Sequence, residues 1–187
     1  MELAIFPRKR TTKGDLKKLR KEGAIPAILY SKGQKNEDLF VNAHDFRKIL
    51  NETKKGRLAT SVFTLKGSKE KFSAIVKEIQ YDVTSYEILH LDFEKLSEKD
   101  RVKVSVPVEC VGEENCVGVK VGGILRQTIR SLRVSCLPRD IPQSFQLDVS
   151  GLELGQNKRV KDIELPKDVK PLAKMQEVIV LVTKPRA

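Results

Sequence analysis

Positive charge is concentrated in the segment from Arg8 to Lys21, which holds eight basic residues and a single acid, Asp15. Because so many like charges repel one another, this segment favours a polyanionic partner. Arginine matches phosphate in two-point contacts, and lysine supplies a mobile point charge. We therefore expect the segment to bind the backbone of a nucleic acid, with an ordinary solvated basic surface as the alternative.

The same segment predicts a short basic helix followed by a strand. Leu16 and Leu19 lie on one helical face and can pack inward, which leaves the lysines toward solvent. Gly14 lets the backbone approach a phosphate closely. Tyr30, at the end of the following strand AIPAILY, is a candidate for contact with a sugar, a base or a phosphate.

A second polar group lies in HLDFE, residues 90–94. Strand alternation places His90 and Asp92 on one face and Leu91 and Phe93 on the other. An acid in a basic RNA site can accept a hydrogen bond from a base amino group or a ribose hydroxyl, or hold an arginine in place. An enzyme that uses His90 as a general base is a further hypothesis, but no nucleophile and none of the common catalytic motifs accompanies it.

The composition narrows the partner class. The formal net charge is +11 and the sequence pI is about 9.6, which favours nucleic acid over neutral ligands. Aromatic residues make up 5%, too few for a platform that stacks single-stranded bases. We expect no catalytic residue, cofactor, metal or small-molecule substrate. The odd set Cys110, Cys116 and Cys136 lacks a CxxC pair and predicts buried thiols in a reducing compartment.

The sequence also predicts a cytoplasmic protein without a membrane partner. No stretch approaches the roughly 18 apolar residues of a membrane span, and the first residues lack the order of a secretory signal. Leu16 and Leu19 supply too little apolar surface for a membrane-bound helix.

The elements that must position these residues are mostly strands, so the expected fold class is mainly β (α+β). In the first half, a helix capped by Asn42, with Phe46, Ile49 and Leu50 on its apolar stripe, is expected to plug a small β-barrel. Strands are predicted over residues 24–30, 38–42, 60–67, 71–83 and around 90–94.

A polar run at residues 96–101 marks the expected junction between an RNA-binding barrel domain, 1–95, and a mainly β domain, 96–187. Pro107 predicts an edge position or a bulge. The segments GVKVGGILRQ and LPKDVKP are interpreted as turns and loops. Strands are predicted over residues 102–111, 130–138, 144–152 and 177–185.

Three blocks in this order resemble a known family: RKRTTKGDLKKLRKEGAIPAILY, HLDFE, and GVKVGGILRQTIRSLRVSCLPRDIPQSFQLDVSGLELGQ. They are similar to the bacterial large-subunit ribosomal proteins numbered twenty-five, in the two-domain form also called the CTC general stress protein. The resemblance runs from about Arg8 to Leu181. It implies a structural component of the large ribosomal subunit, whose barrel binds 5S ribosomal RNA (5S rRNA) at its loop E region.

The resemblance also implies a set of RNA contacts, with Arg10 as an alternative to Arg8. The implied residues are Arg8, Arg20, Tyr30, His90 and Asp92, with further basic positions at Lys13, Lys17 and Lys18.

Two questions stay open at this point. The barrel of this family also resembles the anticodon-binding domain of glutaminyl-tRNA synthetases, so a tRNA-binding accessory module is the alternative function. The second domain is expected either to pack on neighbouring ribosomal RNA or ribosomal protein, or to serve as a stabilising spacer.

Overall fold

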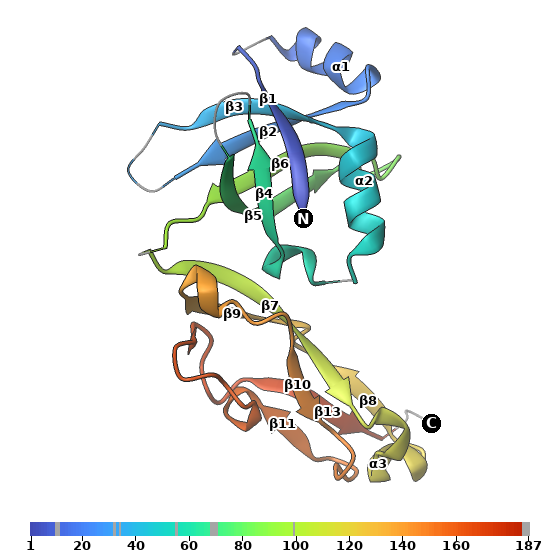
Figure 1. The fold of residues 1–187 in the computed structure, drawn as a ribbon. Helices are drawn as coiled ribbons and strands as arrows, with labels where there is room; N and C mark the ends of the chain where they lie inside the picture. The colour runs from blue at the N-terminus through green and yellow to red at the C-terminus, as the bar shows by residue number, and fades with distance from the viewer. Residues whose placement is uncertain are drawn as a thin grey trace. The chain divides into compact units, whose positions relative to one another are not determined.

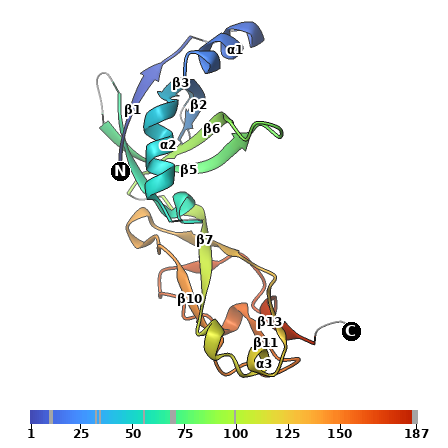
Figure 2. The same cartoon turned by 90° about the vertical axis from the view of Figure 1, so that its right-hand side faces the viewer.

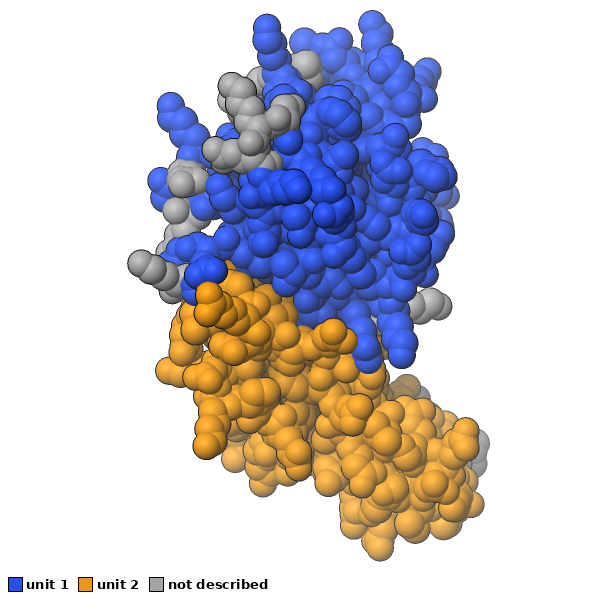
Figure 3. All heavy atoms as spheres, in the orientation of Figure 1, with its two compact units in different colours: residues 1–100 blue, residues 101–187 orange. Residues whose placement is uncertain are grey.

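A computed structural model describes residues 1–9, 12–31, 33, 35–54, 56–67, 71–98 and 100–184 (Figure 1). The chain divides into two compact units, Met1–Asp100 and Arg101–Ala187 (Figure 3). Both units consist mainly of β-strands, which confirms the predicted fold class.

Six strands of the first unit form a closed barrel in the order β1-β3-β2-β6-β5-β4. Most neighbours are antiparallel, but β1 pairs with β4, and β2 pairs with β6, in parallel. The predicted strands of this half are confirmed with small shifts at their ends. Their bounds are β1 (Glu2–Pro7), β2 (Ala24–Tyr30), β3 (Glu37–Asn42), β4 (Val62–Lys66), β5 (Lys71–Tyr81) and β6 (Ile88–Lys95).

The strand β1 was not predicted from the sequence. Its inward side chains, Leu3 and Ile5, are buried in the barrel core and alternate with more exposed neighbours. It pairs with β3 on one side and with β4 on the other, so it closes the ring of strands. The barrel therefore leaves no open sheet edge at β1.

The helix α2 (Ala43–Glu52) confirms the helix expected after Asn42. The Asn42 side chain accepts a hydrogen bond from the His44 N–H at 2.8 Å, which satisfies one of the free donors of the first turn. Phe46 and Ile49 are buried in the barrel core, and the Phe46 ring stacks on Phe63 at a centroid distance of 6.5 Å. This burial agrees with the role of a plug. A 3₁₀ turn, η1 (Leu58–Thr60), follows.

The second unit contains two sheets, one of four strands in the order β10-β7-β9-β12 and one of three in the order β11-β13-β8. The strands predicted over its main apolar runs are confirmed. Their bounds are β7 (Val102–Val111), β8 (Ile124–Gln127), β9 (Ser131–Cys136), β10 (Phe145–Asp148), β11 (Asn157–Arg159), β12 (Lys170–Pro171) and β13 (Val178–Thr183). The short helical turns are η2 (Glu113–Asn115), α3 (Val117–Lys120), η3 (Pro138–Asp140) and η4 (Val160–Asp162).

The interpretation of GVKVGGILRQ as turns and loops was wrong at its end, because ILRQ forms strand β8 against β13. A Cβ on Gly123 would lie 2.5 Å from the Gly118 carbonyl oxygen, so the glycines allow α3 and the start of β8 to pack closely. The LPKDVKP segment likewise contains the two-residue strand β12.

Pro107 lies inside a paired strand, without a bulge in the recorded pairing. Residues 102–107 of β7 pair with β9, and the parallel partner β10 begins at Val108. The Val108 N–H donates to the Arg130 carbonyl oxygen on the β9 side at 2.9 Å. Since successive N–H groups of a strand point to opposite sides, the Pro107 nitrogen faces away from β9, where its missing proton costs no ladder bond.

Candidate nucleic-acid interface

The basic segment forms helix α1 (Lys13–Lys21), which lies outside the ring of strands (Figures 1 and 2). Its single acid, Asp15, serves the helix start, because the Thr12 N–H and Oγ1 donate to its carboxylate at 3.2 and 2.7 Å. These bonds, with a contribution from the Lys18 charge, hold the pKa of Asp15 below its ordinary value. Asp15 is thus ionised and satisfies the first turn of the helix.

The faces of α1 follow the predicted pattern. The helix packs against β2, with Leu16 and Leu19 half-buried and no side chain fully buried. Lys13, Lys17 and Lys18 are exposed. The lysine ammonium groups can therefore reach phosphates without losing much of their hydration.

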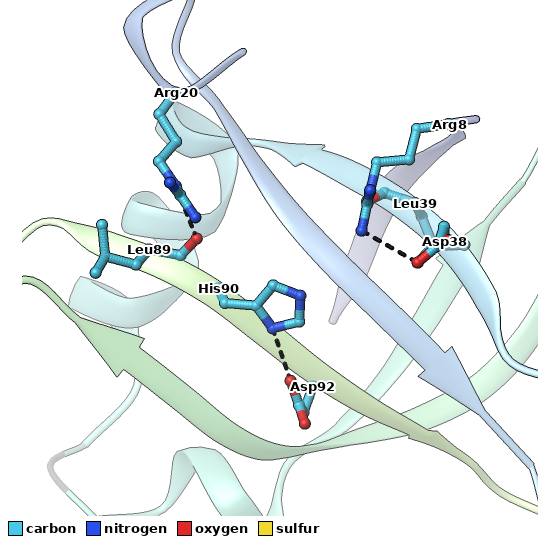
Figure 4. A network of polar contacts seen from close by, with 7 residues as sticks. All are labelled: Arg8, Arg20, Asp38, Leu39, Leu89, His90 and Asp92. Carbon is cyan, nitrogen blue, oxygen red and sulfur yellow. Dashed lines mark hydrogen bonds and ion pairs between the residues drawn. The ribbon is translucent and has the colours of Figure 1, made fainter. Parts of the chain in front are cut away.

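Arg20 fastens α1 to the barrel. Its Nε donates a hydrogen bond to the Leu89 carbonyl oxygen of β6 at 3.0 Å, across 69 positions of the chain (Figure 4). This single bond leaves both Nη groups without a hydrogen-bond partner among the described residues. Arg20 can therefore hold the helix in place and still bind an anion.

The guanidinium group of Arg8 makes more contacts within the barrel than that of Arg20. Its Nε donates to the Leu39 carbonyl oxygen at 3.0 Å, and Nη2 forms an ion pair with Asp38 at 3.1 Å (Figure 4). Only 10% of the Arg8 side chain is exposed. It thus joins the end of β1 to β3, immediately before the basic helix. The alternative candidate, Arg10, lies outside the described residues.

The alternation predicted for HLDFE is confirmed in β6, where Leu91 and Phe93 are fully buried in the barrel. His90 and Asp92 face outward, and Nδ1 of the histidine lies 2.8 Å from Oδ1 of the aspartate (Figure 4). The exposed fractions of the two side chains are 17% and 31%. When Nδ1 carries the proton of a neutral ring, Nε2 is an acceptor and the second carboxylate oxygen stays open to another donor.

The parallel pairing of β2 with β6 brings Tyr30 opposite Glu94 and Ile28 opposite Asp92. Burial raises the pKa of Tyr30 to about 12, and the nearby carboxylates, Glu94 foremost, add to this shift. The hydroxyl is therefore protonated and able to donate a hydrogen bond near neutral pH. Nζ of Lys77 lies 2.7 Å from Oε2 of Glu94, and this ion pair offsets the charge of one carboxylate near Tyr30.

The structure brings most of the candidates to one outer face. Asp38 of β3, which holds Arg8, lies opposite Ile28 of β2, and Ile28 lies opposite Asp92 of β6. Arg20 reaches the same strand as the histidine pair (Figure 4). The result is a surface with lysines on a projecting helix and neutral or acidic hydrogen-bonding groups on the strands beneath it.

An aromatic pair beside this face was missed by sequence reasoning. The rings of Phe6 and Phe40 stack at a centroid distance of 5.2 Å, and Phe6 is 45% exposed. Phe40 lies opposite Pro26 of β2, so the pair is continuous with the strands of the interface. The signal was the alternation in ELAIFP, which places Phe6 outward once β1 is recognised as a strand.

Within the ranges that the structure describes, no group of three or more His, Cys, Asp and Glu residues is placed to hold a metal ion. Nor does any helix in those ranges have the length and apolar character needed to cross a membrane.

Comparison with known proteins identifies relatives of both units. Residues 3–93 match the model of the Ribosomal L25p family, and residues 101–186 match that of the Ribosomal protein TL5, C-terminal domain. This chain is 44% identical to the large ribosomal subunit protein bL25 of Chlamydia abortus, 43% identical to that of Chlamydia caviae and 40% identical to that of Chlamydia pneumoniae. Each similarity covers 98% of this chain and 100% of the relative.

Proposed function

The chain belongs to the ribosomal L25p family of the large ribosomal subunit, in its two-domain form, and on this premise we propose that its first unit binds 5S rRNA. The relatives are named as ribosomal proteins, so the chain is a non-catalytic component of the cytoplasmic ribosome. The observation that carries the proposal is the outer face on which Arg20 fastens the basic helix α1 to β6, next to the His90–Asp92 pair.

The helix supplies affinity and the strands supply selectivity. Lys13, Lys17 and Lys18 neutralise phosphates, and such contacts release counterions but do not depend on RNA sequence. The helix also fixes where these charges stand relative to β6. An RNA must therefore present its phosphates at a matching distance from the groups that the strands contact.

The strands present groups that can distinguish RNA shape. Asp92 can accept a hydrogen bond from a ribose 2′-hydroxyl or a base amino group, and the Tyr30 hydroxyl can donate one. An acid within a basic surface repels phosphate, so Asp92 favours an RNA whose groove edge, rather than its backbone, meets β6. A non-regular duplex such as loop E suits that requirement better than an even A-form helix.

The two arginines have different roles in this proposal. Arg20 both positions α1 and offers its Nη groups to the RNA. Arg8 acts by positioning, because its guanidinium is already occupied by Asp38 and Leu39. Arg10 remains the candidate for a direct contact at this end of the segment.

For the second unit we propose a contact with neighbouring ribosomal RNA or ribosomal protein. The residues after Lys95 carry a net charge of +4, which suits a polyanionic neighbour.

A footprint on isolated 5S rRNA tests partner and location together. We expect protection of loop E by the full chain, and a loss of that protection in Arg20→Ala. His90→Ala, which leaves all lysines in place, should weaken specific binding while it retains salt-sensitive binding to unrelated RNA. Equal footprints from the wild type and Arg20→Ala would show that Arg20 does not take part in the RNA interface.

A competition experiment between tRNA and 5S rRNA distinguishes the proposed function from the alternative, a tRNA-binding module. Unlabelled tRNA should fail to displace labelled 5S rRNA at concentrations at which unlabelled 5S rRNA displaces it fully. Displacement by tRNA at similar concentrations would favour the alternative.

A further inference from the structure

The hairpin between β5 and β6 exposes large apolar side chains that the RNA interface does not use. Val83 is 89% exposed and Tyr86 is 79% exposed, and Tyr81 at the hairpin base is 44% exposed. Figures 1 and 2 show the hairpin extending beyond the body of the barrel. We call residues Tyr81–Glu87 the hairpin tip. A projecting segment with its apolar side chains in water has the form of a protein anchor rather than of an ordinary turn.

The hairpin tip is held in one conformation by its own hydrogen bonds. Oδ1 of Asp82 accepts from the Thr84 N–H at 2.9 Å, from Thr84 Oγ1 at 2.6 Å and from the Ser85 N–H at 3.0 Å. Backbone bonds from Tyr86 N–H to the Asp82 carbonyl oxygen, and from Asp82 N–H to the Glu87 carbonyl oxygen, close the turn. A partner that binds this tip has little ordering entropy to overcome.

Tyr86 is held in an unfavourable backbone conformation. Its φ is +56°, and it is the one described residue other than glycine with a positive φ. For a bulky aromatic residue, a backbone conformation with positive φ is sterically unfavourable. The strain is consistent with a requirement for a ring at this position, directed outward from the turn.

Charge distinguishes the kind of partner. The hairpin tip contains the acids Asp82 and Glu87 and neither lysine nor arginine, in a chain with 36 basic residues. Arg47 of α2 approaches Glu87 at 3.6 Å, with both side chains more than half exposed. An acidic tip repels phosphate and attracts a positively charged surface. Its charge therefore suits the surface of a basic protein better than an RNA backbone.

We propose that the hairpin tip inserts Val83 and Tyr86 into an apolar pocket with a basic rim on a neighbouring protein of the large ribosomal subunit. The proposal rests on membership of that subunit and is independent of 5S rRNA binding by α1 and β6. It assigns the barrel a second contact surface, with the opposite charge and a different class of partner.

Photo-crosslinking in assembled large subunits tests the class of partner. The full chain would carry p-benzoylphenylalanine at position 83 or at position 86, in separate variants. We expect each variant to give a covalent product that ribonuclease leaves intact, and both products to contain the same basic ribosomal protein. A product destroyed by ribonuclease, two different proteins, or no product from either position would overturn the proposal.

A matched pair of variants tests the contribution to binding. Val83→Ser with Tyr86→Asn removes both apolar anchors, and asparagine tolerates the positive φ of position 86. We expect at least about tenfold weaker retention on large subunits, as for the loss of an interface anchor. Binding to isolated 5S rRNA should be unchanged, which separates this test from that of the RNA interface.

Val62→Ser, at a partly exposed position of β4, is the control for loss of an apolar side chain from the barrel surface. It should be retained like the wild type. Equal retention of the hairpin variant and the control, whether both are normal or both are reduced, would contradict the proposal.

Discussion

Lys17 and Arg20 stand one turn apart on α1 but are held in different ways. Arg20 is tied to β6 by the bond to Leu89, whereas the exposed Lys17 has no recorded ion pair among the described residues. In the proposed interface, Lys17 therefore contributes general attraction to phosphate, whereas Arg20 also positions the helix. Substitutions at these positions should have different signatures in the salt dependence of RNA binding.

We predict that Lys17→Ala weakens 5S rRNA binding mainly through its salt dependence. The slope of log K against log salt concentration should fall in magnitude by roughly one unit, since one phosphate contact is lost. Binding titrations over a series of salt concentrations measure this slope. Lys167→Ala removes the same charge from an exposed position of the second unit and should leave the slope unchanged.

For single residues, the sequence alone predicted where basic side chains cluster and which side chains share a face of a strand or helix. Strand alternation in HLDFE predicted that His90 and Asp92 share a face, and helical spacing predicted the half-buried Leu16 and Leu19. The role of Arg8 was not readable, because it depends on a strand 30 positions away that presents Asp38 to it. Bonds across a barrel are set by strand order, which local pattern does not contain.

The second residue of helix α1 is a glycine, Gly14, that the helix geometry does not require. A Cβ on Gly14 would come no closer to a neighbouring atom than 3.9 Å, at Thr12 Oγ1. Alanine is the better helix former, so glycine here lowers the stability of the helix. We interpret that cost as a sign that the backbone is approached from outside.

Accordingly, Gly14→Ala should raise the free energy of unfolding by up to about 1 kcal/mol and still weaken 5S rRNA binding. Thermal denaturation and a binding titration on the same sample measure the two effects. Gly151→Ala, at an open position of the second unit, is the matched control and should not change RNA binding. A variant that is more stable and binds as well as the wild type would show that phosphate does not approach Gly14.

The hairpin tip should keep its structure in acid below the ordinary pKa of an aspartate. Hydrogen bonds, foremost from the Thr84 hydroxyl, lower the pKa of Asp82 from 3.8 to about 2. A carboxylate with a lowered folded-state pKa stabilises the fold above its unfolded value, and that contribution is lost as the pH falls through the folded value. The contribution of Asp82 should therefore disappear between about pH 3.8 and pH 2.

An acid titration followed by NMR measures this transition at the Thr84 and Ser85 amides, which bond to the Asp82 carboxylate. We expect a midpoint near pH 2, absent in Asp82→Asn. A midpoint near 3.8 would mean that the turn is open in solution.

The strands that sequence pattern missed include β1 and β8. β1 has only Leu3 and Ile5 as inward residues, and β8 has four residues after two glycines. The alternation in β1 covers only these two inward residues, and β8 contains no buried residue, so both were overlooked. Each forms a strand by pairing with neighbouring strands. The other main strands and α2 carry their own patterns and were predicted with errors at their ends.

At the scale of the whole molecule, the barrel closes within the first unit, and both remaining sheets lie within the second. The barrel core consists of residues between Leu3 and Phe93. Since no sheet formed by the described residues crosses the boundary after Asp100, we propose that the two units are independent folding domains.

The fragment 1–100 should therefore unfold in a single cooperative transition and bind isolated 5S rRNA within about threefold of the full chain, a difference of less than 1 kcal/mol. Calorimetry and a gel-shift titration test these two outcomes. The same fragment should be retained less well than the full chain on large subunits if the second unit contacts a neighbour. A fragment that aggregates, or that binds 5S rRNA more than tenfold weaker, would argue against independent domains.

The parallel pairing of β2 with β6 has a consequence for synthesis. Tyr30 meets Glu94 across 64 positions of the chain, so the nascent polypeptide carries every lysine of α1 long before it can complete the strand that supports them. If the first unit binds 5S rRNA as proposed, the lysines of α1 can attract RNA only non-selectively until β6 has left the exit tunnel. On the proposed function, selective RNA binding therefore becomes possible only after the last barrel strand has emerged from the tunnel.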